Sequence, residues 1–216
     1  RALMPGAGAV PAVDAVVSGE VENAFCAIRP PGHHAEPTHG MGFCLFNNVA
    51  IAAAHARAEH GLEKIAVVDF DVHHGNGTQS YFEEDPALFF GSTHEYPLYP
   101  GTGAASETGV GNIFNAPLSS GSGSEAFRAR MDDLILPGLR EFGPDLILIS
   151  AGFDGHERDP LATLRLHEDD YSWVTSRIRE IAGEHCDGRV ISTLEGGYDL
   201  DALAASAAAH VHALIA

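Results

Sequence analysis

Side chains that can bind a metal ion follow two of the apolar runs in this sequence. Asp71 and His73 come just after Ile65–Phe70, and Asp154 comes just after Leu146–Ser150. Residues two apart on an extended segment point the same way, so Asp71 and His73 can reach one ion, with Asp154 as a third ligand. This O,N,O set suits Zn²⁺ or Fe²⁺ and leaves a position for water or substrate. Alternatively, Asp71 caps a helix and His73 is an ordinary hydrogen-bonded histidine.

Two adjacent histidines, His33 and His34, follow the apolar run Ala24–Arg29. An imidazole that transfers protons has its second ring nitrogen held by an acceptor, and Asp69 and Asn76, on the neighbouring strand and its following loop, can serve. A carboxylate makes an imidazole more basic than an amide does, so such a pair can divide general-base and electrostatic roles. The alternative is an exposed histidine pair in a loop, or an adventitious metal site.

Tyr198 follows two glycines, Gly196 and Gly197, just beyond the apolar run Val190–Leu194. Glycines let the backbone approach a ligand closely, because they lack a Cβ atom. A tyrosine hydroxyl in that place can donate a hydrogen bond to a developing oxyanion. The alternative is a surface tyrosine in a turn.

Short apolar runs alternate with segments of helical period, which indicates an α/β fold. The predicted strands are Ala24–Arg29, Ile65–Phe70, Leu88–Gly91, Leu146–Ser150 and Val190–Leu194. The predicted helices are Asn47–His60, Ser124–Phe142, Glu168–Ala182 and Leu200–Ile215, and Pro137 is expected to kink or divide the second of them. Strands this continuously apolar are buried on both faces, so we expect an open parallel sheet in a three-layer fold. The polar residues named above would lie at the carboxyl ends of its strands.

Two stretches are predicted to lack strands. Tyr96–Ser124 is rich in Gly, Pro, Ser and Thr, has one short apolar piece at Asn112–Ala116, and is expected to be a long functional loop. Arg1–Gly19 is expected to be a loop followed by a helix. Residues 1–216 contain no repeat or linker, and we interpret them as a single domain that the sequence enters partway through.

The charge balance excludes one class of function. The chain has 12 Lys and Arg against 30 Asp and Glu, so its formal net charge is −18. A general nucleic-acid binder needs clustered basic residues and is not expected here, whereas a cationic substrate is compatible with this charge. Apolar runs are too short for a transmembrane helix and no signal peptide is recognisable, so no membrane partner is expected. Three widely spaced cysteines form no disulfide framework, which favours a reducing, cytoplasmic location.

Taken together, the motifs resemble the zinc-dependent histone deacetylase superfamily, in particular its class II-like bacterial deacetylases and acetylpolyamine amidohydrolases. In chain order they are R-P-P-G-H-H, G-F-C-x-F-N-N, D-x-D-V-H-H-G-N-G-T, S-T-H-E-Y-P-x-Y-P-G-T-G, A-G-F-D-x-H-x-x-D-P-L and L-E-G-G-Y. They run from about Ala24 to Tyr198. The resemblance implies an arginase/deacetylase-like fold. Because the family's catalytic domain normally begins well upstream, an N-terminally incomplete catalytic domain is expected.

At matching positions the resemblance implies a role for each site residue. Zinc would be ligated by Asp71, His73 and Asp154. The proton-transfer and oxyanion groups would be His34 as main general base and then acid, His33 paired with Asp69 as the more electrostatic member, Asn76 orienting His34, and Tyr198. The substrate-binding residues would be Gly42, Phe43, Tyr99 and Gly197, with Phe43 and Tyr99 as the aromatic pair that lines the acyl-lysine tunnel. Structural potassium would lie at Asp69, Asp71, His73, Ser92 and Thr93, and a second ion near Phe82, Asp85, Leu88 and Asn112.

The implied reaction is hydrolysis of an N-acyl amide, above all of an acetyl-lysine side chain, by metal-activated water and the histidine pair. The partner would be an acylated lysine peptide or a small acylated amine, and a homo-oligomer stays open. One alternative is an acetylpolyamine amidohydrolase, and a less favoured one is a non-catalytic module that binds acyl-lysine. A ureohydrolase of the arginase type would need Asp where this chain has Gly75.

Overall fold

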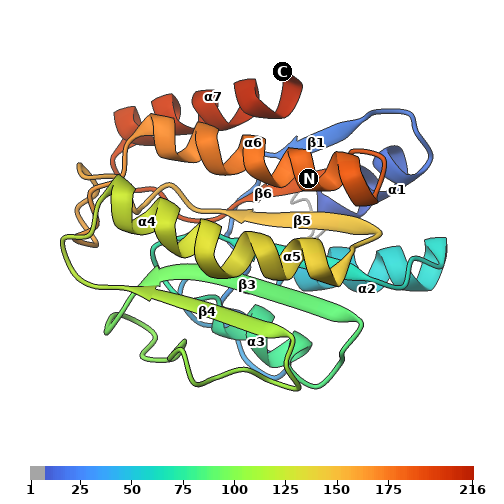
Figure 1. Cartoon of the computed structure of the whole chain (residues 1–216), viewed down its shortest axis with the longest axis horizontal. Helices are drawn as coiled ribbons and strands as arrows, with labels where there is room; N and C mark the ends of the chain where they lie inside the picture. The colour runs from blue at the N-terminus through green and yellow to red at the C-terminus, as the bar shows by residue number, and fades with distance from the viewer. Residues whose placement is uncertain (1–7) are drawn as a thin grey trace.

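A computed structural model of the chain describes residues 8–216 and contains a sheet of six parallel strands with helices on both faces (Figure 1). In sheet order the strands are β1 (Asn23–Cys26), β6 (Val190–Leu194), β5 (Leu146–Ala151), β2 (Ile65–Asp69), β3 (Leu88–Glu95) and β4 (Ile113–Leu118). The helices are α1 (Ala9–Val17), α2 (Asn48–His60), α3 (Asn76–Phe82), α4 (Ser124–Arg130), α5 (Leu136–Phe142), α6 (Glu168–His185) and α7 (Leu200–Ile215). The predicted open parallel α/β sheet is confirmed.

The sheet is packed between two separate hydrophobic cores. Ile65 and Val67 of β2 face a core shared with α1 and α2, whereas Ala66 and Val68 face a core shared with α4, α5, α6 and α7. All four side chains are fully buried. Successive side chains of a strand point to opposite faces, so a strand covered on both sides must be apolar at every position. The three-layer arrangement therefore accounts for the continuous apolar runs of the central strands.

Helix α2 connects the polar edge of the sheet to its opposite edge. It begins after Asn47, whose side chain accepts a hydrogen bond from the Ala50 amide at 3.0 Å, and it ends at Gly61, whose φ is +66°. In its first turn, Asn48 Nδ2 donates to the Pro30 carbonyl at 3.3 Å and ties the helix to the loop after β1. From Gly61 the chain leads into the start of β2.

Two elements of the structure were not predicted. Strand β4 lies within the predicted loop Tyr96–Ser124 and pairs in parallel with β3. It contains Pro117, which is tolerated because β4 is an edge strand and its outer side needs no donor. Helix α3 begins in a Gly-Asn-Gly stretch that is typical of a turn. Gly77 is required there by a close contact, because a Cβ atom would lie 2.2 Å from the Ala35 carbonyl oxygen.

Two predicted strand ends were wrong. Strand β1 stops at Cys26 rather than Arg29, because the Ile28 amide turns back to bond the Cys26 carbonyl at 2.8 Å. Strand β3 continues past Gly91 to Glu95, through polar residues that are nevertheless buried. Polar side chains in a strand interior need internal hydrogen-bond partners, and these partners cannot be read from the local sequence.

The predicted helix Ser124–Phe142 is divided, as expected from Pro137. A π-helical turn, η1 (Met131–Ile135), separates α4 from α5, and Pro137 lies in the first turn of α5. In contrast, Gly183 does not end α6, which continues to His185. Left-handed backbone comes only afterwards, at Asp187 with φ +52°. The Gly183 position is open, so this glycine is neither a cap nor a close contact.

Helix α1 lies within the predicted N-terminal helical segment and confirms that part of the prediction. The loop expected before it falls mostly on residues 1–7, outside the described residues. Among residues 8–216, no helix combines the length and the apolar character that crossing a membrane requires.

Shortening one side chain of the central strand β5 tests the core that the sheet shares with α1 and α2. Leu148 is fully buried between the sheet and the α1–α2 layer. We expect Leu148→Ala to lower the free energy of unfolding by about 2–5 kcal/mol, because it removes buried methyl groups and leaves a cavity. Urea denaturation measures this loss. Leu200→Ala is the control, since Leu200 is 77% exposed, and a comparable loss there would contradict the assignment of the core.

Candidate active site

Loops from four strands meet at the carboxyl edge of the sheet. They follow β1, β2, β5 and β6 and carry, in turn, His33, Asp71, Asp154 and Tyr198. The prediction that β1 and β2 are neighbouring strands was wrong. Strands β6 and β5 lie between them. The loop after β1 therefore crosses the ends of two strands to bring its histidines to β2.

The three predicted metal ligands converge on one point. His73 Nδ1 lies 3.1 Å from Asp71 Oδ1 and 3.1 Å from Asp154 Oδ2. One ligand atom from each of the three residues lies within 4.8 Å of the other two. Ligands about 2.0 Å from a tetrahedral ion are separated by roughly 3.3 Å, so this spacing fits a zinc ion.

The electrostatics of the triad also fit a cation. The Asp71 and Asp154 side chains are fully buried, and such carboxylates are costly unless a positive charge and hydrogen bonds compensate them. Burial and the charge of Asp71 raise the pKa of Asp154 to about 6. Burial opposes charge on His73, but its bonds to Asp154 and Asp71 raise its pKa to about 11. The pocket is therefore strongly electronegative, and the residues present suit Zn²⁺ or Fe²⁺.

Backbone amides aim the two carboxylates. Asp71 Oδ2 accepts from the Gly196 amide at 2.8 Å, and Asp154 Oδ1 accepts from the Val72 amide at 2.9 Å. These bonds fix one oxygen of each carboxylate and direct the other toward His73. Gly152 and Gly196 leave the necessary space, because a Cβ atom on either would lie 2.1 or 2.0 Å from Asp71 Oδ2 or Asp154 Oδ2, respectively.

The two histidines of the loop after β1 have different partners. His33 Nδ1 lies 3.0 Å from Asp69 Oδ2, and His34 Nδ1 lies 2.8 Å from Asn76 Oδ1. Their ring centroids are 4.0 Å apart. His33 Nε2 is also 3.8 Å from Asp71 Oδ1, so His33 borders the predicted metal ligands. Both histidines are buried, which excludes the exposed-loop alternative.

Opposite electrostatic environments separate the two histidines. Burial disfavours charge on His33, but Asp71 and Asp69 outweigh it and raise its pKa to about 10. Burial and the charge of His33 lower the pKa of His34 to about 3. These surroundings favour the charged form of His33 and the neutral form of His34.

Two carboxylates that the sequence analysis did not single out position this machinery. Glu195 is fully buried, and its Oε2 accepts from the Gly32 amide at 2.6 Å and from the His33 amide at 3.2 Å. Asp159 Oδ2 accepts from the Tyr198 amide at 2.7 Å. Glu195 holds the histidine loop, and Asp159 holds the tyrosine. The signal for Glu195 was its place directly after a buried strand, where an acidic residue needs donors.

A cavity of about 410 Å³ reaches His73 of the triad. It is lined by His34, Gly42, Phe43, His73, Leu98, Tyr99, Leu161 and Tyr198. Its mouth is aromatic, with Phe43 and Tyr99 both exposed and the Phe43 and Tyr198 ring centroids 6.2 Å apart. Gly42 and Phe43 have φ values of +54° and +65°. A Cβ atom at Gly42 would lie 2.2 Å from His34 Cδ2, so this glycine lets the cavity wall approach the imidazole.

Gly197, predicted to bind substrate, is not among the residues that line the cavity. Its φ is +138°, and a Cβ atom there would lie 2.8 Å from Leu203 Cδ1 of helix α7. The glycine thus sets the backbone turn that precedes Tyr198 and packs against α7. Its role as a substrate contact stays a prediction.

Cys44 lies beneath the cavity wall rather than in it. Its side chain is buried, and Sγ donates to the Gly42 carbonyl at 3.3 Å. Burial raises the pKa of the thiol well above its usual value. A thiol that stays protonated is a poor nucleophile, so Cys44 is a packed residue.

The residues predicted to hold potassium form two groups. In the first, Ser92 and Thr93 are buried on β3, and Ser92 pairs with Asp69 in the sheet. Ser92 Oγ lies 2.9 Å from His94 Nδ1, while the Thr93 hydroxyl is buried without a hydrogen-bond partner among the described residues. An unpaired buried hydroxyl is compatible with a nearby cation, and this potassium site stays a prediction.

In the second group, carbonyl oxygens converge on one amide. Asn112 Nδ2 lies 2.8, 3.0 and 2.7 Å from the carbonyl oxygens of Phe82, Asp85 and Leu88. An amide nitrogen carries two hydrogens, so it cannot serve three acceptors fully. The predicted residues are thus together in space, and the ion itself stays a prediction.

Comparison with known proteins agrees with this fold. The profile of the histone deacetylase domain matches residues 1–214. The chain therefore belongs to the histone deacetylase family, whose members are deacetylases and amidohydrolases and are typically zinc-dependent.

Individual relatives place the chain within that family. It is 47% identical to "Histone deacetylase 10, chloroplastic" of Oryza sativa subsp. japonica over 95% of this chain and 48% of the relative. It is 41% identical to "Polyamine deacetylase HDAC10" of Homo sapiens over 99% of this chain and 33% of the relative. The crystal structure of the HDA15 HD domain superposes with a TM-score of 0.93 at 39% identity, over 98% of this chain and 60% of that one. The chain thus spans half or less of the length of these two relatives. Because the rice relative is named as chloroplastic, the cytoplasmic location stays a prediction.

A glycine substitution tests the tight packing of the triad. We expect Gly196→Ala to abolish stoichiometric zinc binding, because its Cβ atom would collide with Asp154 Oδ2 and Asp71 Oδ2. Metal analysis of the purified protein measures this loss, and circular dichroism reports whether the fold is kept. Gly183→Ala is the matched control, since nothing lies within 4 Å of its Cβ position. Retention of one zinc by a folded Gly196→Ala protein would contradict the geometry.

Proposed function

We propose that the protein hydrolyses N-acyl amides, with the acetyl-lysine side chain as the foremost substrate. The observation that supports this most directly is that His73, which converges with Asp71 and Asp154, lines the same cavity as His34 and Tyr198. A metal site, a neutral imidazole and a phenol around one cavity are the groups that amide hydrolysis needs. Family membership supports the same reaction class.

The triad would hold Zn²⁺, or Fe²⁺, through Asp71, His73 and Asp154. An ion held by these residues would polarise the acyl carbonyl and would lower the pKa of the attacking water. A ligand set of one imidazole and two carboxylates carries two negative charges and leaves at least one position for water or substrate. The backbone bonds from Gly196 and Val72 keep both carboxylates aimed before substrate arrives.

His34 acts as the general base. Asn76 Nδ2 donates to Glu36 Oε1 at 2.7 Å, so the Asn76 carbonyl oxygen faces His34 and accepts from its Nδ1. That arrangement places the proton on Nδ1 and leaves Nε2 free to take a proton from the attacking water. Because the pKa of His34 is low, the imidazole is neutral at physiological pH and available as a base.

His33 makes the same residue an effective acid in the next step. Its charge is held by Asp69 and Asp71, and it lies beside the His34 ring. Once His34 has taken a proton, repulsion between two adjacent imidazolium groups favours its release to the leaving amine. The pair therefore divides the work: His33 supplies a fixed charge, and His34 moves the proton.

Tyr198 stabilises the negative charge that develops on the acyl carbonyl oxygen when water attacks the acyl carbon. Burial raises the pKa of its hydroxyl above the usual value, so the hydroxyl keeps its proton and can donate it in a hydrogen bond. Asp159 holds the Tyr198 backbone, and the tyrosine lines the cavity beside Phe43. The aromatic rings of Phe43 and Tyr99 at the mouth suit the aliphatic stem of an acyl-lysine side chain.

Removal of the Tyr198 hydroxyl tests this role. We expect Tyr198→Phe to lower kcat by about 10²–10³-fold, the usual cost of one oxyanion donor, with zinc content unchanged. Steady-state kinetics on an acetyl-lysine peptide and metal analysis of the full-length protein provide the two measurements. Asp154→Ala is the comparison and should lose both zinc and activity. Normal turnover by Tyr198→Phe would refute the oxyanion role, and full zinc retention by Asp154→Ala would refute the ligand assignment.

Acetylpolyamines are a second candidate substrate class. The net charge of −18 favours cationic substrates, and the human relative is named as a polyamine deacetylase. The cavity mouth itself carries aromatic rather than acidic residues, which favours an acyl-lysine peptide.

Parallel assays separate the two substrate classes. We expect kcat/KM for an acetyl-lysine peptide to exceed that for acetylspermidine by at least about tenfold, a preference that corresponds to about 1.4 kcal/mol. The reverse preference would assign the protein to polyamines.

A further inference from the structure

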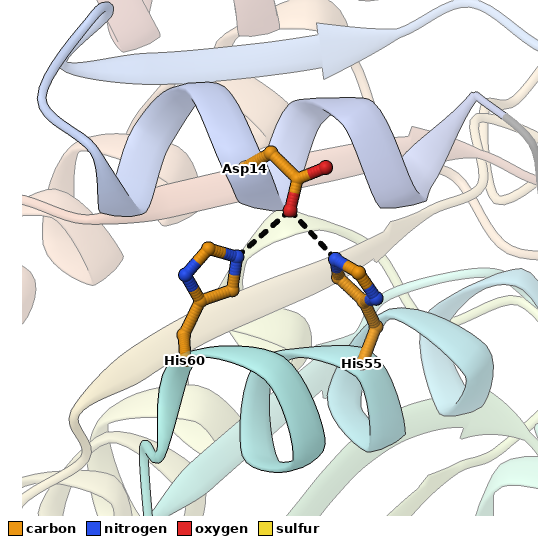
Figure 2. Close-up of side chains that lie close together, drawn as sticks. All are labelled: Asp14, His55 and His60. Atoms are coloured by element: carbon orange, nitrogen blue, oxygen red, sulfur yellow. Dashed lines mark hydrogen bonds and ion pairs between the residues drawn. The ribbon is translucent and has the colours of Figure 1, made fainter.

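We propose that Asp14, His55 and His60 form a second site, for a divalent transition-metal ion of the zinc class, on the outer surface of helices α1 and α2. Figure 2 shows Asp14 reaching from α1 toward two imidazole rings that rise from α2. No role in acyl-amide hydrolysis uses these residues. The proposal does not depend on the proposed function.

The three side chains already share one point in space. Asp14 Oδ1 lies 2.6 Å from His55 Nε2 and 2.7 Å from His60 Nε2. The ligand atoms of all three residues lie within 4.8 Å of one another, as they do in the triad at the carboxyl edge of the sheet. The two imidazole side chains are only 21% and 23% exposed, whereas Asp14 is 53% exposed. The rings are thus held in place, while the carboxylate is free to adjust.

The convergence of the rings is not a consequence of helix periodicity. His60 lies five residue steps after His55, which corresponds to about 7.5 Å along a helix and roughly 140° around it. Neighbours on one helix face are three or four residues apart. The ring centroids nevertheless approach to 5.5 Å, because both side chains turn toward Asp14 (Figure 2).

The donor set selects the class of ion. Two imidazole nitrogens and one carboxylate oxygen suit Zn²⁺ and related transition metals, whereas Mg²⁺ and Ca²⁺ prefer oxygen ligands alone. Hydrogen bonds from His55 and His60 lower the pKa of Asp14, so the carboxylate is ionised at neutral pH. Ligands of a tetrahedral ion are roughly 3.3 Å apart, so the exposed Asp14 carboxylate needs to withdraw by about 0.6–0.7 Å to admit the ion. Water from the solvent side would complete the coordination.

The site lies at the edge of the sheet opposite the carboxyl ends. The first turn of α2 contacts the loop after β1, but His60 is the last residue of α2, next to the start of β2. The twelve residue steps from Asn48 to His60 span about 18 Å. An ion here would join α1 to α2 above the core that both helices share, and would be structural rather than catalytic.

The expected effect is an additional zinc ion that fastens α1. Purified full-length protein is stripped with a chelator, reloaded with zinc and dialysed, and zinc per chain is then counted. In Asp14→Asn, the amide oxygen can still accept hydrogen bonds from the histidines, but it is a weak metal ligand. His60→Ala removes one ligand completely. We expect each variant to hold one zinc fewer than wild type, with an affinity at this site reduced by about 100-fold or more in competition with a chromophoric chelator.

A second readout reports the clamp itself. Zinc should slow amide hydrogen exchange in α1 of the wild type and leave it unchanged in Asp14→Asn. His212→Ala is the matched control, because His212 is an exposed histidine on α7 outside the cluster, and it should behave as wild type. The proposal is overturned if Asp14→Asn and His60→Ala retain the wild-type zinc count. It is equally overturned if the additional ion binds only at millimolar zinc, which would indicate adventitious binding to surface histidines.

Discussion

The burial of two carboxylates in one pocket determines how the loops at the carboxyl edge of the sheet are arranged. Asp71 and Asp154 have no access to solvent, and His73 lies between them. Such an arrangement is unfavourable unless positive charge and directed donors compensate it. The chain supplies backbone amides and two imidazoles, and a metal ion would complete the compensation. The features that make the pocket costly to form are the same ones that make it selective for a cation.

This requirement extends outward through the loops. The carboxylates leave no room for a Cβ atom at positions 152 and 196, which explains glycine at both, and the Gly196 amide approaches closely enough to donate to Asp71. The loop after β1 must cross two strand ends to deliver His33, and Glu195 at the end of β6 anchors it on the way. The electrostatic separation of the two histidines then follows from placement alone, with carboxylates around one ring and an amide against the other.

Much of this arrangement could be predicted because it follows from general rules of parallel sheets. Apolar runs identified the central strands, and the polar residues after them had to meet at one edge. What the sequence did not reveal depends on contacts between distant segments. Strand β4 was missed because its segment is rich in residues typical of loops, including Pro117, which an edge strand can accommodate. Helix α3 was missed because Gly77 is typical of a turn, whereas here the glycine is needed for its close contact with the Ala35 carbonyl oxygen. The pairing of Asp14 with His55 and His60 follows from the packing of α1 on α2, which no local pattern encodes.

The burial of all three thiols has a practical consequence. Cys26, Cys44 and Cys186 are inside the protein, and burial raises the pKa of Cys26 and of Cys186 to about 11. None of these sulfurs is poised to react with maleimides or iodoacetamide. A cysteine engineered onto the surface of these 216 residues would therefore be the preferred reactive handle. Fluorophores or spin labels could be attached at one chosen point without first removing the natural cysteines.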